Sequence, residues 1–190
     1  MGQGSSICAV KGGKSIDTSM GLTPLGGIPM VTRSGDLDPS VITYLMKKEK
    51  LTAQEMEDIL NKKSGVSGIS GLAPDFRVIE NASNEGNERA QIAISSFNYA
   101  IAGDVAKYAV EMDGLDYIVF TGGIGENQIN IRKGICEKLK FMGVELDLEA
   151  NNMRGEEKVI STPQSKIKIY VIPTNEELMI ARETKRLTQK

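Results

Sequence analysis

Residues 117–127, with the sequence YIVFTGGIGEN, constrain the fold of this chain more than any other stretch. The apolar residues 117–120 have the composition of a strand that is covered on both faces. The strand breaks into a turn with Gly122, Gly123 and Gly125, which lack the Cβ atoms that keep a ligand away from backbone. We expect a helix to begin there, with free N–H groups that favour anions or polar ligand atoms. The pattern is typical of nucleotide-binding turns in α/β proteins and also of purely structural turns.

Length and charge narrow the class of protein. The 190 residues, 40% of them hydrophobic and 25% charged, are enough for one well-packed domain. The formal net charge is −2, without the basic excess that nucleic-acid binding needs, so we expect no nucleic-acid partner. No apolar run reaches the length of a membrane span, and residues 1–6 lack the features of a signal peptide. We therefore expect a cytoplasmic protein with no membrane partner.

The residues available for chemistry are restricted by the absence of histidine from the sequence. This absence removes the commonest general base and the commonest transition-metal ligand, so carboxylates, lysines, arginines and backbone must carry any reaction. An oxygen-liganded cation such as Mg²⁺ remains compatible with the sequence. Cys8 and Cys136 lie in apolar surroundings, which predicts buried free thiols and not a disulfide or a metal pair.

The first part of the chain predicts a hairpin followed by helices. Residues 6–10 and 15–20 are β-rich and flank a Gly-Gly reversal, as in a β-hairpin. The motif Asp-Pro-Ser at 38–40 opens a helix, and a capping box begins a second helix that occupies residues 52–63. Residues 64–71 are so rich in glycine that we expect a loop.

The remaining sequence alternates helices and strands. Residues 87–112 carry apolar side chains at helical spacing, which predicts the longest helix, with a face that belongs to the core or to an interface. Residues 131–142 predict another amphipathic helix, residues 167–172 a buried strand, and residues 174–177 a capping box at the start of a final helix. Since no linker or repeat interrupts this order, residues 1–190 are expected to form a single α/β domain.

Two common phosphate-binding motifs are incomplete in this sequence. The tripeptide Gly-Lys-Ser at 13–15 suggests a Walker A loop, but Cys8 stands where that motif requires glycine. The Gly-Ile-Gly at 123–125 lacks the third glycine of the dinucleotide fingerprint, because Gln128 stands at that position. The sequence therefore disfavours a P-loop NTPase and a Rossmann dehydrogenase.

Four other segments have residues suited to phosphate or nucleotide chemistry. The glycines at 2–4 precede a strand, as in a phosphate-binding hairpin, although a disordered start fits equally well. Arg33 lies in a glycine-flanked loop, where it can stabilise a transferring phosphoryl group or be simply solvated. Residues 75–77, Asp-Phe-Arg, suit ribose hydrogen bonding and adenine or phosphate packing. Glu177 completes the final capping box, which leaves Glu176 free for another role or for a purely surface position.

Taken together in chain order, these motifs resemble those of the acetate kinase family over essentially all 190 residues. The resemblance implies an acyl-phosphate-forming kinase of the actin-like ATPase superfamily, which transfers the γ-phosphoryl group of ATP to a short carboxylate. The implied fold is a ribonuclease H-like α/β domain with a mixed sheet flanked by helices. The motifs concerned are GxGSS at 2–6, KSIDTSM at 14–20, TPL at 23–25, TRSGDLDP at 32–39, DFR at 75–77, GIGEN at 123–127 and PTNEE at 173–177.

The resemblance also implies roles for individual residues. Arg33 would stabilise the transferring phosphoryl group, Pro24 would line the acetate pocket, and Glu176 would bind Mg²⁺ or Mn²⁺. ATP would be the co-substrate. The implied nucleotide contacts are Gly2, Gly4, Asp75, Phe76, Arg77, Gly123, Ile124, Gly125, Glu126 and Asn127.

Departures from the family pattern bear on what this chain can do alone. The family has a histidine, an apolar residue, glycine and asparagine where this chain has only Met1, Gly2 and Gln3, so the chain resembles the C-terminal half of a two-domain kinase without its N-terminal domain. Gly26 replaces a family glutamate, and Val31 replaces a glycine and can restrict the loop that carries the catalytic arginine.

The resemblance leads to two expectations and leaves two alternatives open. The isolated chain is expected to be inactive in converting ATP and acetate to ADP and acetyl phosphate, and to form a homodimer. Propionate or butyrate kinase is an alternative within the same chemistry, since most of the carboxylate pocket belongs to the other half. A non-catalytic dimerisation module is the alternative outside enzymes.

Overall fold

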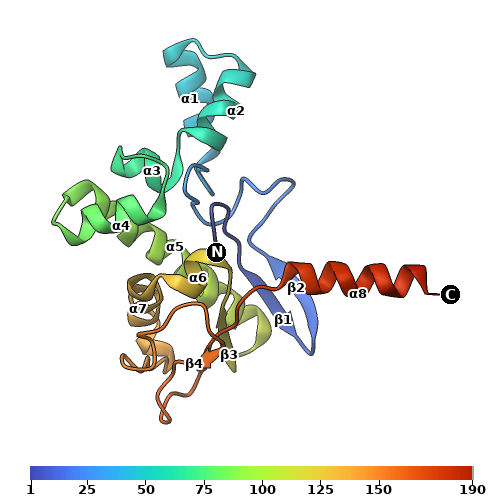
Figure 1. The fold of residues 1–190 in the computed structure, drawn as a ribbon. Coiled ribbons are helices and arrows are strands. Elements are labelled where there is room, and N and C mark those ends of the chain that lie inside the picture. Colours follow the sequence, from blue (N-terminus) through green and yellow to red (C-terminus); the bar gives the residue numbers. More distant parts are fainter. Residues whose placement is uncertain (190) are drawn as a thin grey trace.

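The computed structural model describes residues 1–189 and has an α/β architecture (Figure 1). A mixed sheet has the strand order β3-β5-β4, with β3 (Tyr117–Phe120) parallel to β5 (Lys168–Val171) and β4 (Lys158–Val159) antiparallel to β5. The helices are α1 (Pro39–Glu49), α2 (Ala53–Lys62), α3 (Gly65–Ser70), α4 (Phe76–Asn84), α5 (Glu88–Met112), α6 (Gly122–Asn127), α7 (Ile129–Lys138) and α8 (Glu176–Thr188), with a 3₁₀ turn at Lys140–Met142.

The predicted hairpin is confirmed. Strands β1 (Cys8–Lys11) and β2 (Lys14–Thr18) pair antiparallel around Gly12 and Gly13. Both glycines have positive φ angles, 59° and 76°, which a two-residue turn of this type requires. Cys8 on this hairpin is exposed, so the prediction of two buried thiols is wrong for Cys8 and confirmed for Cys136. Burial raises the pKa of the Cys136 thiol to about 12.

Local capping signals predicted the helix starts well. The Asp38 carboxylate accepts a hydrogen bond from the Ser40 amide at 2.8 Å. Thr52 and Glu55 form the reciprocal capping box that opens α2. The helix α5 begins after its cap Asn87 and ends at Met112, as its apolar spacing predicts.

The core lies between one face of the sheet and the helices α5 and α7. Ile118 and Ile169 on the strands pack with Phe97 of α5 and Ile131 of α7 in one buried cluster. The opposite side of β3 is open, with Tyr117 58% exposed. The prediction that this strand is covered on both faces is therefore wrong, because only the face of Ile118 and Phe120 is buried, while Tyr117 and Val119 on the other face are exposed.

The apolar stripe of α5 belongs to the core. Phe97, Ile101 and Tyr108 are all buried within the chain, which removes them as candidates for an interface. The exposed apolar side chains of this helix, Tyr99 and Val110 among them, lie elsewhere on it.

The glycine-rich segment at 64–71 forms the helix α3, so the loop prediction is wrong. Its first amides find acceptors in a distant loop: Val66 donates to the Met30 carbonyl and Ser67 to that of Val31, both at 2.9 Å. Gly65 has a positive φ of 63°, and a Cβ there would lie 2.2 Å from the Met30 carbonyl oxygen. Tertiary contacts thus outweigh the poor helix propensity of glycine, and they anchor the loop that contains Arg33.

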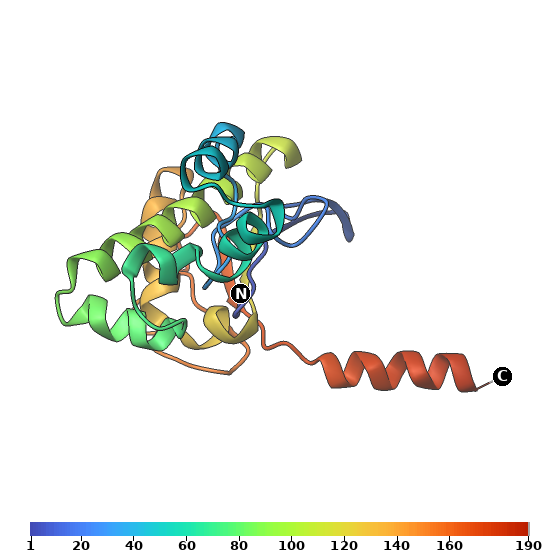
Figure 2. The same ribbon diagram turned by 90° about the horizontal axis from the view of Figure 1, so that it is seen from above.

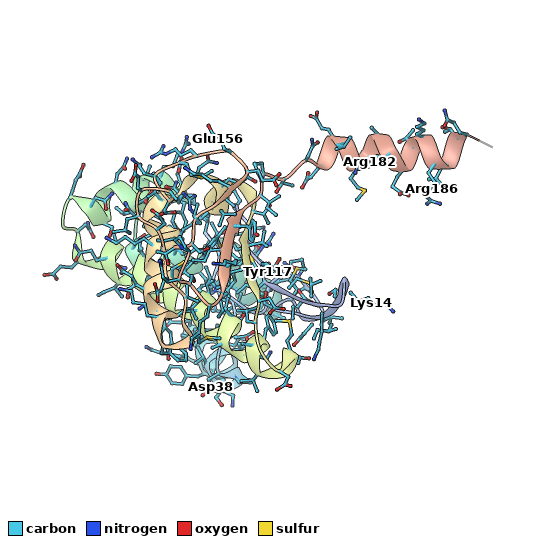
Figure 3. All side chains as sticks on the ribbon, turned by 90° about the horizontal axis from the view of Figure 1, so that it is seen from below. Lys14, Asp38, Tyr117, Glu156, Arg182 and Arg186 are labelled. Atoms are coloured by element: carbon cyan, nitrogen blue, oxygen red, sulfur yellow. The ribbon has the colours of Figure 1, made fainter. Side chains whose placement is uncertain are left out.

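Helix α8 projects from the body of the molecule (Figures 1 and 2), and none of its residues is buried. Figure 3 shows Arg182 and Arg186 on this helix far from the other labelled side chains. The helix is capped by Asn175, whose side chain accepts from the Leu178 amide at 2.9 Å. The predicted Thr174–Glu177 capping box is therefore wrong. Within residues 1–189, no helix has the length and apolar character needed to cross a membrane.

Candidate nucleotide and phosphoryl-transfer site

Three segments that are distant in the sequence line one cavity of about 600 Å³. They are the N-terminal glycine loop, the start of α4, and the turn between β3 and α7. A cavity of this size is in the range that small-molecule and cofactor sites occupy. The predicted nucleotide residues among its lining are Gly2, Asp75, Phe76, Arg77, Gly123, Ile124 and Asn127.

The start of α4 presents a carboxylate and a guanidinium to this cavity. Asp75 caps the helix by accepting from the Arg77 amide at 2.9 Å, and it also forms an ion pair with the Arg77 guanidinium at 2.7 Å. These hydrogen bonds lower the pKa of the Asp75 carboxyl to about 2, which keeps it ionised at neutral pH. A carboxylate has about four acceptor positions, so it can still accept from a ligand hydroxyl.

The aromatic ring of Phe76 is part of the core. The side chain is buried, and its ring centroid lies 5.1 Å from that of Phe97. Packing on α5 occupies part of this ring, and Phe76 also lines the cavity, so its interpretation as a surface for adenine packing stays a prediction.

The glycine turn after β3 forms the opposite wall and is held by internal hydrogen bonds. Gly122 has a φ of 74°, and a Cβ there would lie 2.8 Å from the Met1 carbonyl oxygen, so the turn requires glycine. The Gly122 amide donates to the Glu126 carboxylate at 2.8 Å, and the Ile124 amide donates to the Met1 carbonyl at 2.7 Å. The expectation that these N–H groups are free for an anion is wrong for Gly122 and Ile124.

The Glu126 carboxylate joins this turn to the end of β5. The same oxygen that accepts from Gly122 also accepts from the Thr174 amide at 2.9 Å. Thr174 in addition shares a hydrogen bond of 2.8 Å between its hydroxyl and that of Thr121. Glu126 therefore fixes the backbone of the cavity wall, and it lies next to the lining residues together with Gly125.

Arg33 lies close to the glycine loop and to Pro24. A Cβ placed on Gly4 would be 3.2 Å from the Arg33 Nη1 atom, and the same Nη1 lies 3.5 Å from the Pro24 carbonyl oxygen. The Gly2–Gly4 loop thus passes from the cavity, which Gly2 and Gln3 line, to the guanidinium of Arg33. The structure brings the predicted catalytic arginine, the predicted acetate-pocket proline and the glycine loop together.

The loop of Arg33 is well anchored despite the valine at position 31. Val31 is buried, lines the cavity, and is absent from the non-glycine residues with positive φ. Ser34 donates to the Leu60 carbonyl and Ser64 to that of Thr32, both at 2.9 Å. Val31 was expected to restrict the backbone of this loop. The loop nevertheless forms, because Val31 does not need a positive φ angle here.

Glu176 is exposed at the first position of α8. In the part of the chain that the structure describes, no group of three or more acidic or cysteine side chains is arranged to hold a metal ion. Mg²⁺ is commonly bound by one or two carboxylates together with substrate phosphates and water. Glu176 supplies a single exposed carboxylate and does not line the cavity, so the described residues do not form a metal centre by themselves.

Several residues of the site had no signal in the sequence. Glu80 and Arg154 line the cavity, and burial raises the pKa of the Glu80 carboxyl. Glu80 lies one helical turn after Phe76, a spacing that could have suggested it. Arg154 lies in an irregular loop, where nothing in the local pattern distinguishes it. Gln3, Asn81 and Gln128 complete the polar lining.

Comparison with known proteins gives consistent matches. The family model described as "Acetokinase family" matches residues 1–182. The acetate kinase of Thermoanaerobacter pseudethanolicus is 57% identical over 190 residues, which are 100% of this chain and 47% of that protein. The chain thus spans about half the length of the curated relatives it matches.

Two solved structures are similar over nearly the whole chain. The crystal structure of Porphyromonas gingivalis acetate kinase matches with a TM-score of 0.95 and 48% identity, and covers 100% of this chain and 48% of that one. A propionate kinase from Francisella tularensis matches with a TM-score of 0.90 and 46% identity, and covers 96% of this chain and 47% of that one.

Proposed function

The chain belongs to the acetokinase family, and on this premise we propose that it is the C-terminal, nucleotide-binding half of an acetate kinase. The proposed reaction transfers the γ-phosphoryl group of ATP to acetate and yields ADP and acetyl phosphate. The α/β architecture with its mixed sheet is consistent with the ribonuclease H-like fold of actin-like ATPases. The observation that carries the proposal is the single cavity lined by three predicted nucleotide-binding segments, with Arg33 beside its glycine loop.

We propose a direction for the nucleotide in the cavity. Gly2 and Gln3 line the cavity and Gly4 adjoins Arg33, so the phosphate chain would lie along this loop and end at the guanidinium. The ribose would then face Asp75 and Arg77, with Asp75 accepting hydrogen bonds from its hydroxyl groups. The base would occupy the part of the cavity beyond them. Gly123, Ile124 and Asn127 would contact the nucleotide from the opposite wall, with Gly125 and Glu126 supporting it.

Arg33 is suited to stabilise the phosphoryl group during transfer. Its contacts to the Pro24 carbonyl oxygen at 3.5 Å and to the Met30 sulfur at 3.4 Å are long, which leaves most of its five N–H donors available. Acetate would lie near Pro24, so that a carboxylate oxygen attacks the γ-phosphorus as the bond to the bridging oxygen of ADP breaks. Phosphoryl transfer needs this kind of positioning and charge neutralisation more than covalent participation by the protein.

The divalent cation and the oligomeric state are further parts of the proposal. Glu176 would be one carboxylate ligand of Mg²⁺ or Mn²⁺, which neutralises phosphate charge when bound. We propose a homodimer because exposed apolar side chains remain on this chain, such as Tyr99 and Val110 of α5, and symmetric pairing is the usual way to bury such a surface. We also propose a cytoplasmic location, since the proposed reaction consumes ATP.

Propionate is the alternative acceptor, because a propionate kinase is among the similar structures. Pro24 is the proposed acyl contact in this chain, and the loop that contains it borders a second cavity of about 300 Å³ between residues 21–26 and the start of α1. The length of the acyl chain depends on pocket residues that the other half of the relatives would supply.

The test is reconstitution of activity. The chain is mixed or co-expressed with the N-terminal half of a related acetate kinase, and acyl phosphate is trapped as the hydroxamate with acetate, propionate and butyrate. We expect no turnover by the chain alone, turnover by the pair, and the highest kcat/KM with acetate. A folded pair without turnover on any of the three acids would contradict the proposed function. If that inactive pair still dimerised, the chain would be better described as a dimerisation module.

A further inference from the structure

Arg132 of α7 is completely buried and forms a dense set of hydrogen bonds. Its guanidinium donates to the carbonyl oxygens of Gly125 and Glu126, both at 2.9 Å, and to those of Asn151 and Met153, at 2.8 and 2.9 Å. Its Nε donates to the side-chain oxygen of Asn151 at 2.7 Å. Every nitrogen of the guanidinium therefore has a protein acceptor.

This burial is energetically costly, because Arg132 has no carboxylate partner among the ion pairs of residues 1–189. Burial accordingly lowers the pKa of its guanidinium. A buried charge without a counterion is tolerated only where hydrogen bonds compensate for lost hydration. Lysine, with its three donors on a single nitrogen, cannot reproduce the planar fork that reaches carbonyls on two segments.

The two segments that Arg132 joins are both walls of the cavity. Gly125 and Glu126 belong to the short helix α6, whose other residues include Gly123 and Asn127 of the lining. Met153 immediately precedes Arg154, which lines the cavity from the loop after the 3₁₀ turn. A second link, from the Gly155 amide to the Glu126 carbonyl at 3.3 Å, joins the same two segments at the surface.

Arg154 forms no direct ion pair among residues 1–189, although its charge lowers the pKa of the Glu80 carboxyl of the same lining against the larger effect of burial. Its guanidinium is therefore available to a ligand at the cavity. The other arginine of the lining, Arg77, is already paired with Asp75. The preceding residue is Met153, and its carbonyl oxygen accepts a hydrogen bond from Arg132. The position of Arg154 therefore depends on Arg132.

We propose that Arg132 is a positioning residue for nucleotide binding, which fixes the α6 turn and the Arg154 loop relative to each other. Arg154 is the side chain that this link presents to the nucleotide. The inference rests on the proposed function, since the ligand of the cavity is taken to be a nucleotide. If Arg132 only stabilised the fold, its replacement would lower the stability of the whole domain and would not increase hydrogen exchange selectively in these two segments.

The test compares Arg132→Lys with Lys133→Met, a control on the same helix whose side chain is half exposed. Amide hydrogen exchange is measured segment by segment, and ADP affinity is measured by NMR titration, which tolerates weak binding. For Arg132→Lys we expect exchange at 122–127 and 151–155 to rise about tenfold, with the β1–β2 hairpin unchanged, and ADP binding to weaken about tenfold. Lys133→Met should match the wild type in both.

Two further variants keep the inference testable if Arg132→Lys does not fold. Asn151→Ala removes one acceptor of Arg132 and should increase exchange in the same two segments by a smaller factor. Arg154→Ala should weaken ADP binding without any change in exchange at 122–127. Unchanged local exchange and unchanged ADP affinity in Arg132→Lys would overturn the inference. Absence of ADP binding by the wild type would instead contradict the proposed function, while the exchange data would still test the positioning role.

Discussion

The nucleotide cavity and the segment that begins at Glu176 differ in how firmly the chain itself holds them. The walls of the cavity are fixed by contacts within the chain: Phe76 packs on Phe97, Glu126 accepts two backbone amides, and Arg132 joins two segments. Glu176 stands at the exposed start of α8, a helix without a single buried residue. The same family resemblance suggested functional residues in both regions, but only the first region has a geometry that supports them.

The difference indicates which part of the proposed reaction this chain can organise alone. Nucleotide binding requires a preformed cavity, and the chain forms one. Metal binding and acyl transfer require several groups that converge, and among the described residues no group of three or more acidic or cysteine side chains is arranged to hold a metal ion. A 13-residue helix without a buried residue is marginal in water, so the described residues do not fix the position of Glu176.

The largest expected effect concerns Arg33. In the reconstituted enzyme, Arg33→Ala should lower kcat about 10³-fold, because an arginine that meets the transferring phosphoryl group contributes at least that much, whereas the KM for ATP should change little. Steady-state kinetics of the pair measure both constants. The control is Arg186→Ala on α8, whose side chain pairs with Glu183. If kcat and ATP affinity fell by the same factor, Arg33 would bind ATP in the ground state, and its proposed role in the transition state would be contradicted.

The next effect tests the metal assignment on α8. Glu176→Gln should lower Mg²⁺-dependent kcat/KM about tenfold or more, as is typical when a group around a metal is removed. Glu177→Gln should have little effect, because Asn175 is the cap and neither glutamate is needed to begin the helix. Titration of activity with Mg²⁺ distinguishes the two variants. A larger loss for Glu177→Gln than for Glu176→Gln would show that the metal ligand is misassigned.

A third change tests how firmly the cavity wall is held. Glu126→Ala removes the acceptor of the Gly122 and Thr174 amides, and we expect it to lower the free energy of unfolding by about 2 kcal/mol. Urea denaturation measures this difference, with Glu177→Ala as a control that should stay within about 0.5 kcal/mol of the wild type. Equal stability of both variants would mean that the Glu126 link contributes nothing to this wall.

The smallest effect is the pH dependence of Asp75. Its folded-state pKa of about 2 lies below the ordinary value of 3.8, so its contribution to stability is fully present above about pH 4 and is lost as the pH falls through 2. A carbon-13 NMR titration of the carboxyl should therefore show a midpoint near 2. Arg77→Met should shift this midpoint upward toward 3.8, because the Arg77 hydrogen bonds are the main cause. A wild-type midpoint already near 3.8 would mean that the pair does not form in solution.

The elements that the sequence predicted well are those with local causes. The Asp38 cap and the Thr52–Glu55 box act within one turn of helix, and the Gly12-Gly13 reversal acts within two residues, so their patterns can be recognised without knowledge of the rest of the fold. The glycine turn after β3 was found for the same reason.

The elements that could not be predicted from the sequence depend on residues far away in the chain. Helix α3 forms because the Met30 and Val31 carbonyls accept from its first amides, and nothing in its own sequence indicates this. The hydroxyl of Thr174, which follows β5, forms a hydrogen bond with the hydroxyl of Thr121, which follows β3, so Thr174 does not cap α8. Arg132 sits in an amphipathic helix between an apolar residue and a lysine, where sequence alone predicts a solvated arginine.

The most direct measurement is a map of ADP binding on the isolated chain by backbone amide NMR, in the absence of divalent metal. Our account predicts shifts at residues 2–4, 75–81, 123–128 and 153–155 at millimolar ADP, with the amides of α8 unchanged. Shifts confined to other segments, or no shifts at saturating ADP, would contradict the claim that this chain forms the nucleotide-binding half of the site.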